Sequence, residues 1–170
     1  MIAMTIFLMV FNVNSRNGRA MNETTAFYAM ATQTESFAKI LRRDLQGIQD
    51  VLTISETSQS GGVTVFSFRS RIGQDTTLRT ISYRKTPAAT HYGTLFYYIE
   101  RLIDGTVDGE SGDIITDWEI IALNEDAGNI TDTDDAAQVY VRLEAASPML
   151  ETEVIRSIKW ESRFFPPLRN

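Results

Sequence analysis

Histidine and cysteine are the residues that most often carry catalysis or bind transition metals, and this chain of 170 residues contains one histidine, His91, and no cysteine. A serine-type hydrolase would need His91 as its base and a nucleophile on a sharp strand-to-helix turn, and the sequence shows no pattern for such a turn. One imidazole without thiolates also falls short of the ligands that a zinc site needs. His91 stands in Thr-His-Tyr-Gly, which is typical of a loop between strands. We therefore predict an exposed loop histidine and no catalytic residue.

Carboxylates offer a second kind of chemistry, because a flexible loop rich in carboxylates can bind Ca²⁺. The better candidate is the segment 104–113, DGTVDGESGD. Its candidate ligands are Asp104, Asp108, Glu110 and Asp113. The loop 125–135 carries a second cluster, which consists of Asp132, Asp134 and Asp135. Neither spacing is that of an EF-hand, and a solvated acidic loop accounts for both compositions. We predict no cofactor and keep calcium at the first loop as the alternative.

Sugar and nucleic-acid chemistry find less support in the sequence. Glycoside hydrolysis needs a defined pair of carboxylates, and nothing singles out a pair among the many acidic residues. The aromatic residues Phe96, Tyr97 and Tyr98 could stack on single-stranded nucleic acid, but they are better explained as filling both faces of a central strand. The net charge is −6, and the lysines and arginines are scattered along the chain. We therefore do not expect a nucleic-acid partner.

The first element that would position these residues is a helix. From Phe27 to Leu52 the apolar residues recur at spacings of three and four, which is the pattern of an amphipathic helix. Only Gly18 and Gly47 interrupt a helix that extends from Met1, so we predict a helix from Met1 to about Leu52. The side chains expected to pack it against a sheet are Phe27, Met30, Phe37, Leu41, Leu45 and Ile48. Charged residues between them, Asp44 included, are expected on the other faces.

The first eleven residues, MIAMTIFLMVF, are apolar except for Thr5. As a helix they would be about 16 Å long at ~1.5 Å per residue, which is too short to cross a bilayer core of ~30 Å. One interpretation is a signal peptide, although the usual basic residues before the apolar run are missing. We prefer an apolar run that continues upstream of Met1 and serves as a membrane or filament-core stem. The stem side chains within this chain are Met1, Ile2, Met4, Ile6, Phe7, Leu8, Val10 and Phe11. The chain then divides into an apolar stem, 1–26, and a head, 27–170.

After Thr53 the pattern changes to short runs of β-branched and aromatic residues between turn residues, which indicates strands. The six predicted strands cover residues 63–69, 77–84, 94–102, 117–123, 138–145 and 154–164. The segments 55–62 and 104–113 are predicted to be loops. A sheet with one apolar face and a helix with one apolar stripe bury these surfaces against each other. We therefore predict an α+β fold in which a long N-terminal α-helical stem packs against an antiparallel β-sheet head.

In this order, the segments resemble those of type IV pilin-like proteins. MIAMTIFLMVF is similar to the stretch that follows the Gly-Phe-Thr-Leu-(Ile/Val)-Glu-Val motif of type IV prepilins. Residues 40–48, ILRRDLQGI, resemble the end of the stem helix in J-type minor pseudopilins of type II secretion and in related minor pilins. Residues 81–84 (ISYR) and 95–105 (LFYYIERLIDG) resemble a tyrosine-bearing strand and its hairpin partner in that group, and the C-terminal RFFPPLRN resembles its last strand. The resemblance covers nearly the whole chain, but the prepilin cleavage motif is missing from it.

The resemblance implies a subunit without catalysis, which helps to initiate or cap a type II secretion pseudopilus or a type IV pilus. The partners it implies are other pilin-like subunits, the inner membrane before assembly, and prepilin peptidase where the cleavage motif exists. It also implies a single pass through the bacterial inner membrane, with the head in the periplasm or on the cell surface at the filament tip. Two alternatives remain open: a tethered or secreted periplasmic or surface binding module, and an exported hydrolase.

Overall fold

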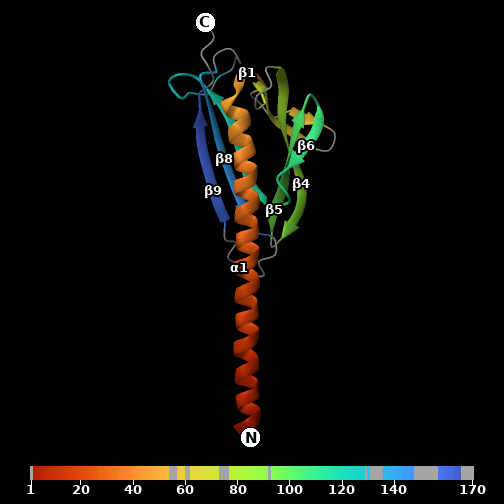
Figure 1. Ribbon diagram of the computed structural model, residues 1–170, viewed down its shortest axis with the longest axis vertical. Helices are drawn as coiled ribbons and strands as arrows, with labels where there is room; N and C mark the ends of the chain where they lie inside the picture. Colours follow the sequence, from red (N-terminus) through yellow and green to blue (C-terminus); the bar gives the residue numbers. More distant parts are fainter. Residues whose placement is uncertain are drawn as a thin grey trace.

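The computed structural model consists of one long helix and one antiparallel sheet (Figure 1). It describes residues 2–53, 57–59, 62–72, 77–91, 93–128, 130, 136–147 and 157–165. The elements are α1 (Ile2–Gln46), β1 (Ile48–Thr53), β2 (Thr57–Gln59), β3 (Gly62–Arg71), β4 (Leu78–His91), β5 (Thr94–Ile103), β6 (Thr106–Glu110), β7 (Ile115–Leu123), β8 (Gln138–Ala146) and β9 (Ser157–Phe164). The strands are ordered β1-β3-β4-β5-β7-β8-β9, with β2 added to β3 and β6 added to β5.

Helix α1 is continuous over 45 residues, but only its later part meets the sheet. Phe27 is partly buried against the core and Met30 is buried, whereas the described side chains between Val13 and Asn22 are all exposed. Figure 1 shows residues 2–26, which we call the projecting part of α1, extending beyond the sheet. At ~1.5 Å per residue the whole helix is about 68 Å long.

The helix ends at Gln46, earlier than the predicted Leu52, because the chain must pass close to β3 there. A Cβ atom on Gly47 would lie 2.6 Å from the carbonyl oxygen of Arg71, so only glycine fits. The Arg71 N–H donates to the Gly47 carbonyl at 3.3 Å, and the Ser70 hydroxyl donates to the Asp44 carbonyl at 2.7 Å. These two hydrogen bonds satisfy carbonyls that a helix end leaves unpaired. Residues 48–53 then pair with β3 as strand β1.

Aromatic side chains form the centre of the core between α1 and the sheet. The ring of Phe37 in α1 lies 6.1 Å from that of Tyr83 in β4 and 5.8 Å from that of Trp118 in β7, measured between centroids. The Tyr83 and Trp118 rings are themselves 5.8 Å apart. Of the residues predicted to pack the helix on the sheet, Met30, Phe37, Leu41, Leu45 and Ile48 are buried and Phe27 is partly buried. Ile48 belongs to β1 rather than to the helix.

The fold class expected from the sequence is corrected by these observations. The antiparallel sheet, rather than the long N-terminal helical stem, makes up most of the protein, and α1 is its one helix among the described residues. The expectation was wrong because three segments predicted as helix or loop are strands, namely β1, β2 and β6. Each of them pairs with one neighbouring strand at the margin of the sheet. Margin strands tolerate polar side chains, so their sequences resemble those of loops.

The sheet has a narrow junction between β5 and β7. These strands are joined by one described residue pair, Tyr97 with Ile115, whereas β4 and β5 pair over ten positions. Ser111 reinforces the junction, since its N–H donates to the Ile99 carbonyl at 3.0 Å. Helix α1 contacts β3 on one side of the junction and both β8 and β9 on the other. The helix therefore holds the two parts of the sheet together.

Candidate functional site

The last turn of α1 carries a buried carboxylate that is fully engaged by the sheet. Asp44 accepts hydrogen bonds from the Tyr83 hydroxyl at 2.8 Å and from the Arg101 Nε and Nη2 atoms at 2.5 and 3.0 Å. The side chains of Asp44 and Arg101 are 0% and 4% exposed. Arg101 also donates from Nη1 to Asp108 on β6. One guanidinium thus joins the end of the helix to the β5–β6 hairpin.

Burial determines the protonation of this cluster. It raises the pKa of the Tyr83 hydroxyl well above its ordinary value, and the negative charge of Asp44 adds to the effect. For Arg101, burial alone would lower the pKa, but the hydrogen bonds and charge of Asp44 outweigh it and leave the pKa raised. Tyr83 therefore remains a hydrogen-bond donor and Arg101 remains a cation. The cluster is suited to hold the helix in place, since both donors already have an acceptor.

The exposed position predicted for Asp44 was wrong. Asp44 lies seven residues after Phe37 and three after Leu41, so it belongs to the buried stripe of the helix. A carboxylate at a stripe position, together with an arginine inside the predicted strand 94–102, is the signal that could have revealed the pair. Arg101 itself is buried, as are its strand neighbours Ile99 and Phe96.

The four carboxylates proposed as calcium ligands are distributed along the β5–β6 hairpin and the turn after it. Asp104 accepts from the Thr80 N–H at 2.9 Å and from Arg79 at 3.0 Å, and these contacts lower its pKa, the Thr80 bond contributing most. Asp108 is bound by Arg101, while Glu110 and Asp113 are exposed. Within the described part of the chain, no three histidine, aspartate or glutamate side chains are placed to hold a metal ion.

Several other predicted features have a definite place. Residues 106–110 form strand β6 rather than a loop, and the second acidic cluster, Asp132 to Asp135, lies outside the described residues. His91 is exposed, at the end of β4 rather than in a loop, and its ring forms a T-shaped pair with that of Phe96, with 5.5 Å between the centroids. Alternation along β5 puts Tyr97 on the face opposite to Phe96 and Tyr98, so the three rings do not share one surface.

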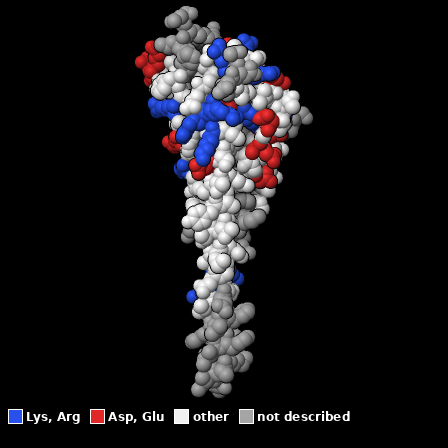
Figure 2. All heavy atoms as spheres, in the orientation of Figure 1, with Lys and Arg blue, Asp and Glu red and all other residues white. Residues whose placement is uncertain are grey.

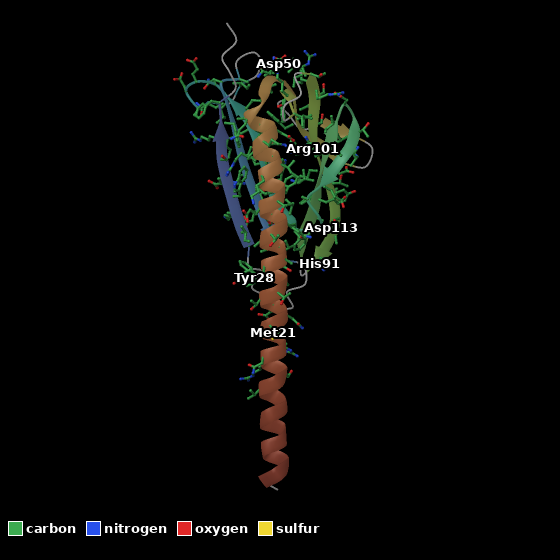
Figure 3. The ribbon with its side chains drawn as sticks, in the orientation of Figure 1. Met21, Tyr28, Asp50, His91, Arg101 and Asp113 are labelled. Atoms are coloured by element: carbon green, nitrogen blue, oxygen red, sulfur yellow. The ribbon has the colours of Figure 1, made fainter. Side chains whose placement is uncertain are left out.

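The projecting part of α1 exposes apolar side chains that the sheet does not cover. The exposed fraction is 56% for Val13, 73% for Met21 and 67% for Tyr28, which lies just after this part. Figure 3 places Met21 beyond the sheet and Tyr28 at its margin. The helix backbone includes the predicted stem positions from Ile2 to Phe11, whereas their side chains and Met1 lie outside the described residues. Within the described part of the chain, no helix combines the length and apolar character needed to cross a membrane.

A groove of about 360 Å³ runs between α1 and the margin strand β9, and we call it the α1–β9 groove. It is lined by Ala31, Thr34, Glu35, Ala38, Lys39, Arg42, Ile158, Lys159 and Trp160. The guanidinium of Arg42 lies 6.0 Å from the centroid of the Trp160 ring, a cation–π contact. Among the described strands, β9 pairs with β8 alone.

Comparison of the chain with protein families, with curated protein sequences and with solved structures found no match. The surfaces described above are therefore the basis for assigning a function. Two of them are suited to contacts with other proteins, namely the projecting part of α1 and the α1–β9 groove.

Proposed function

We propose that this protein is a non-catalytic subunit of a pilin-like filament, of the minor pilin or minor pseudopilin kind. In this role it helps to initiate or cap a type II secretion pseudopilus or a type IV pilus, and its partners are other pilin-like subunits. The observation that carries the proposal is the length of α1, whose residues 2–26 extend beyond the sheet in Figure 1. The resemblance of the N-terminal apolar run and of residues 40–48 to pseudopilins points in the same direction.

A free helix of this length needs a partner surface. Isolated helices are marginal in water, and most helical stability in proteins comes from the packing of an apolar face. Along α1, the large side chains of Met21 and Tyr28 are 73% and 67% exposed. Contact with the helices of neighbouring subunits would bury them, which is favourable at about 25 cal/mol per Å² of apolar surface. Assembly into a bundle of such helices accounts for both the length and the exposed side chains.

The place of the protein in the cell forms part of the same proposal. Before assembly, the N-terminal apolar residues would associate with the bacterial inner membrane, with the sheet in the periplasm or, in a pilus, on the cell surface at the filament tip. Transfer from lipid to a bundle of helices exchanges one apolar surrounding for another, so its free energy is small and an assembly motor can drive it. Prepilin peptidase would be a partner if a cleavage motif precedes the apolar run.

Photocrosslinking in the source cell tests the proposal. A photoreactive phenylalanine derivative replaces Met21, on the projecting part of α1, and in a matched control it replaces Leu78, which is 46% exposed at the start of β4. We expect the probe at position 21 to crosslink to a protein that mass spectrometry identifies as pilin-like. The control probe at position 78 should give that adduct weakly or not at all.

Two outcomes would overturn the proposal. One is a probe at position 21 that crosslinks only to proteins unrelated to pilins or to none. The other is a gene deletion that leaves both filament assembly and type II secretion at the level of the parent strain. A subunit that initiates or caps the filament should reduce one of these activities strongly when it is lost.

A further inference from the structure

We propose that the α1–β9 groove binds the acidic β5–β6 hairpin of a second copy of this chain, so that copies associate side by side. The proposal goes beyond the proposed function, because it concerns contacts between the sheet parts of identical chains and does not need the projecting part of α1. It depends on the shape and charge of two surfaces on opposite flanks of the molecule.

The first surface is the α1–β9 groove, which has an apolar base and a basic rim. Ile158 and Trp160 of β9 form one side, and the small side chains Ala31 and Ala38 of α1 allow a partner to approach closely. Both β9 residues are partly buried against the core, so they offer apolar surface that is still open to a partner. Apolar surface that a partner covers and removes from water commonly forms the centre of a protein interface.

The rim of the groove carries a positive net charge. Two cations of α1, Lys39 and Arg42, line it together with one carboxylate, Glu35, which gives a net charge of 2 − 1 = +1. Lys159 alternates to the other face of β9, where it pairs with Glu144 at 3.5 Å. The ion pair between Lys39 and Glu35 is 2.9 Å long and exposed on both sides, so it is easily rearranged. Arg42 also makes a cation–π contact with Trp160, which joins α1 to β9 across the groove. Figure 2 shows basic side chains gathered in a band across α1 at the level of the sheet.

The second surface is the β5–β6 hairpin with the turn that follows it. Asp104 is paired with Arg79, whereas Asp108 shares Arg101 with Asp44. Glu110 and Asp113 are exposed, and among the described residues neither takes part in an ion pair, which leaves a surplus of two negative charges. Figure 2 shows acidic side chains gathered on the flank where β6 lies, beside the basic band. Figure 3 labels Asp113 on that flank.

The positions of the two surfaces determine how copies would be arranged. They lie on different flanks of the sheet and at a similar height along α1 in the view of Figures 1 and 2. A contact between two different surfaces is heterologous, and repeating it gives a ring or an open helical array. A positive net charge on the groove and a negative one on the hairpin favour contact between these two unlike surfaces and disfavour contact between two like surfaces.

Charge exchange tests the proposal with the full chain in a mild non-ionic detergent. The first variant, Lys39→Glu/Arg42→Glu, makes the groove acidic, and the second, Glu110→Lys/Asp113→Lys, makes the hairpin basic. Sedimentation equilibrium should show that each variant alone self-associates at least about tenfold more weakly than the natural chain. An equimolar mixture should associate again, because each surface of one variant then faces the opposite charge on the other. Association of the natural chain should weaken in about 0.5 M salt, where the screening length is a few ångströms.

The outcomes separate this contact from other modes of association. Self-association of both variants at the level of the natural chain would overturn the proposal, since it would indicate contacts through the projecting part of α1. A natural chain that stays monomeric at low salt, or a mixture that fails to recover, would also overturn it. Circular dichroism of each variant verifies folding, which the exposed positions of all four residues lead us to expect. These residues lie outside the projecting part of α1, so failure here leaves the photocrosslinking test of the proposed function intact.

Discussion

The buried carboxylate at the end of α1 allows a quantitative prediction. Replacing Asp44 with alanine removes the acceptor of three hydrogen bonds, two from Arg101 and one from Tyr83. The Arg101 side chain is 4% exposed, so its charge loses its main partner without gaining water. Breaking a buried ion pair costs about 3–5 kcal/mol. Asp108 still contacts Arg101, so we expect Asp44→Ala to lower the free energy of unfolding by about 3–4 kcal/mol.

Urea unfolding followed by tryptophan fluorescence measures this loss, because the Trp118 ring lies 5.8 Å from the Tyr83 ring. The matched control is Glu35→Ala, which removes the carboxylate of an exposed ion pair on the same helix and should leave the unfolding midpoint nearly unchanged. The variant Asp44→Ala/Arg101→Met should recover much of the stability, because it no longer buries an unpaired charge.

Two results would refute this reasoning. One is an Asp44→Ala chain within about 1 kcal/mol of the natural protein, which would mean that water or Asp108 fully replaces the lost partner. The other is a double variant less stable than Asp44→Ala, which would mean that Arg101 contributes mainly through packing of its aliphatic part.

Four further predictions concern the helix and the core that it shares with the sheet. Because the pKa of Tyr83 is raised in the folded protein, the free energy of unfolding should be intact below the ordinary tyrosine pKa of 10.0 and should fall as the pH rises beyond it. Urea unfolding between about pH 9 and pH 11 should show a smaller fall for Tyr83→Phe than for the natural chain. Leu41→Ala should lower the free energy of unfolding by about 2–5 kcal/mol in the same assay, since Leu41 is fully buried. Phe37→Asp should abolish the cooperative thermal transition, because it places a charge between two aromatic rings. A chain lacking residues 1–25 should still melt cooperatively by circular dichroism, because contact with the sheet begins at Phe27, and loss of that transition would contradict the role assigned to the sheet.

The sequence contains the signal for the helix and for the longer strands. Apolar spacing of three and four marks the residues from Phe27 to Leu45, and alternation marks β8, where Val139, Val141 and Leu143 are buried. Both signals are local and depend only on which face of an element is covered. The balance between helix and sheet was not predictable in this way, because β1, β2 and β6 are strands only through their pairing with β3 or β5.

The site was less predictable than the fold, since its parts come together only in three dimensions. Asp44 and Arg101 are 57 residues apart in the chain, and each separately has the appearance of a surface charge. The acidic residues of the segment 104–113 suggested a metal, but arginines of β4 and β5 occupy two of them. The α1–β9 groove has no sequence signal, because it depends on how far the helix lies from the last strand.

The narrow junction between β5 and β7 has a mechanical consequence. A pull on the projecting part of α1 reaches the sheet through Gly47 into β1 and through Phe37 into both Tyr83 and Trp118, which stand on either side of the junction. The tension is therefore divided between two groups of strands instead of acting on one hydrogen-bonded ladder. A rod anchored in this way can transmit axial force while the body to which it is attached remains folded.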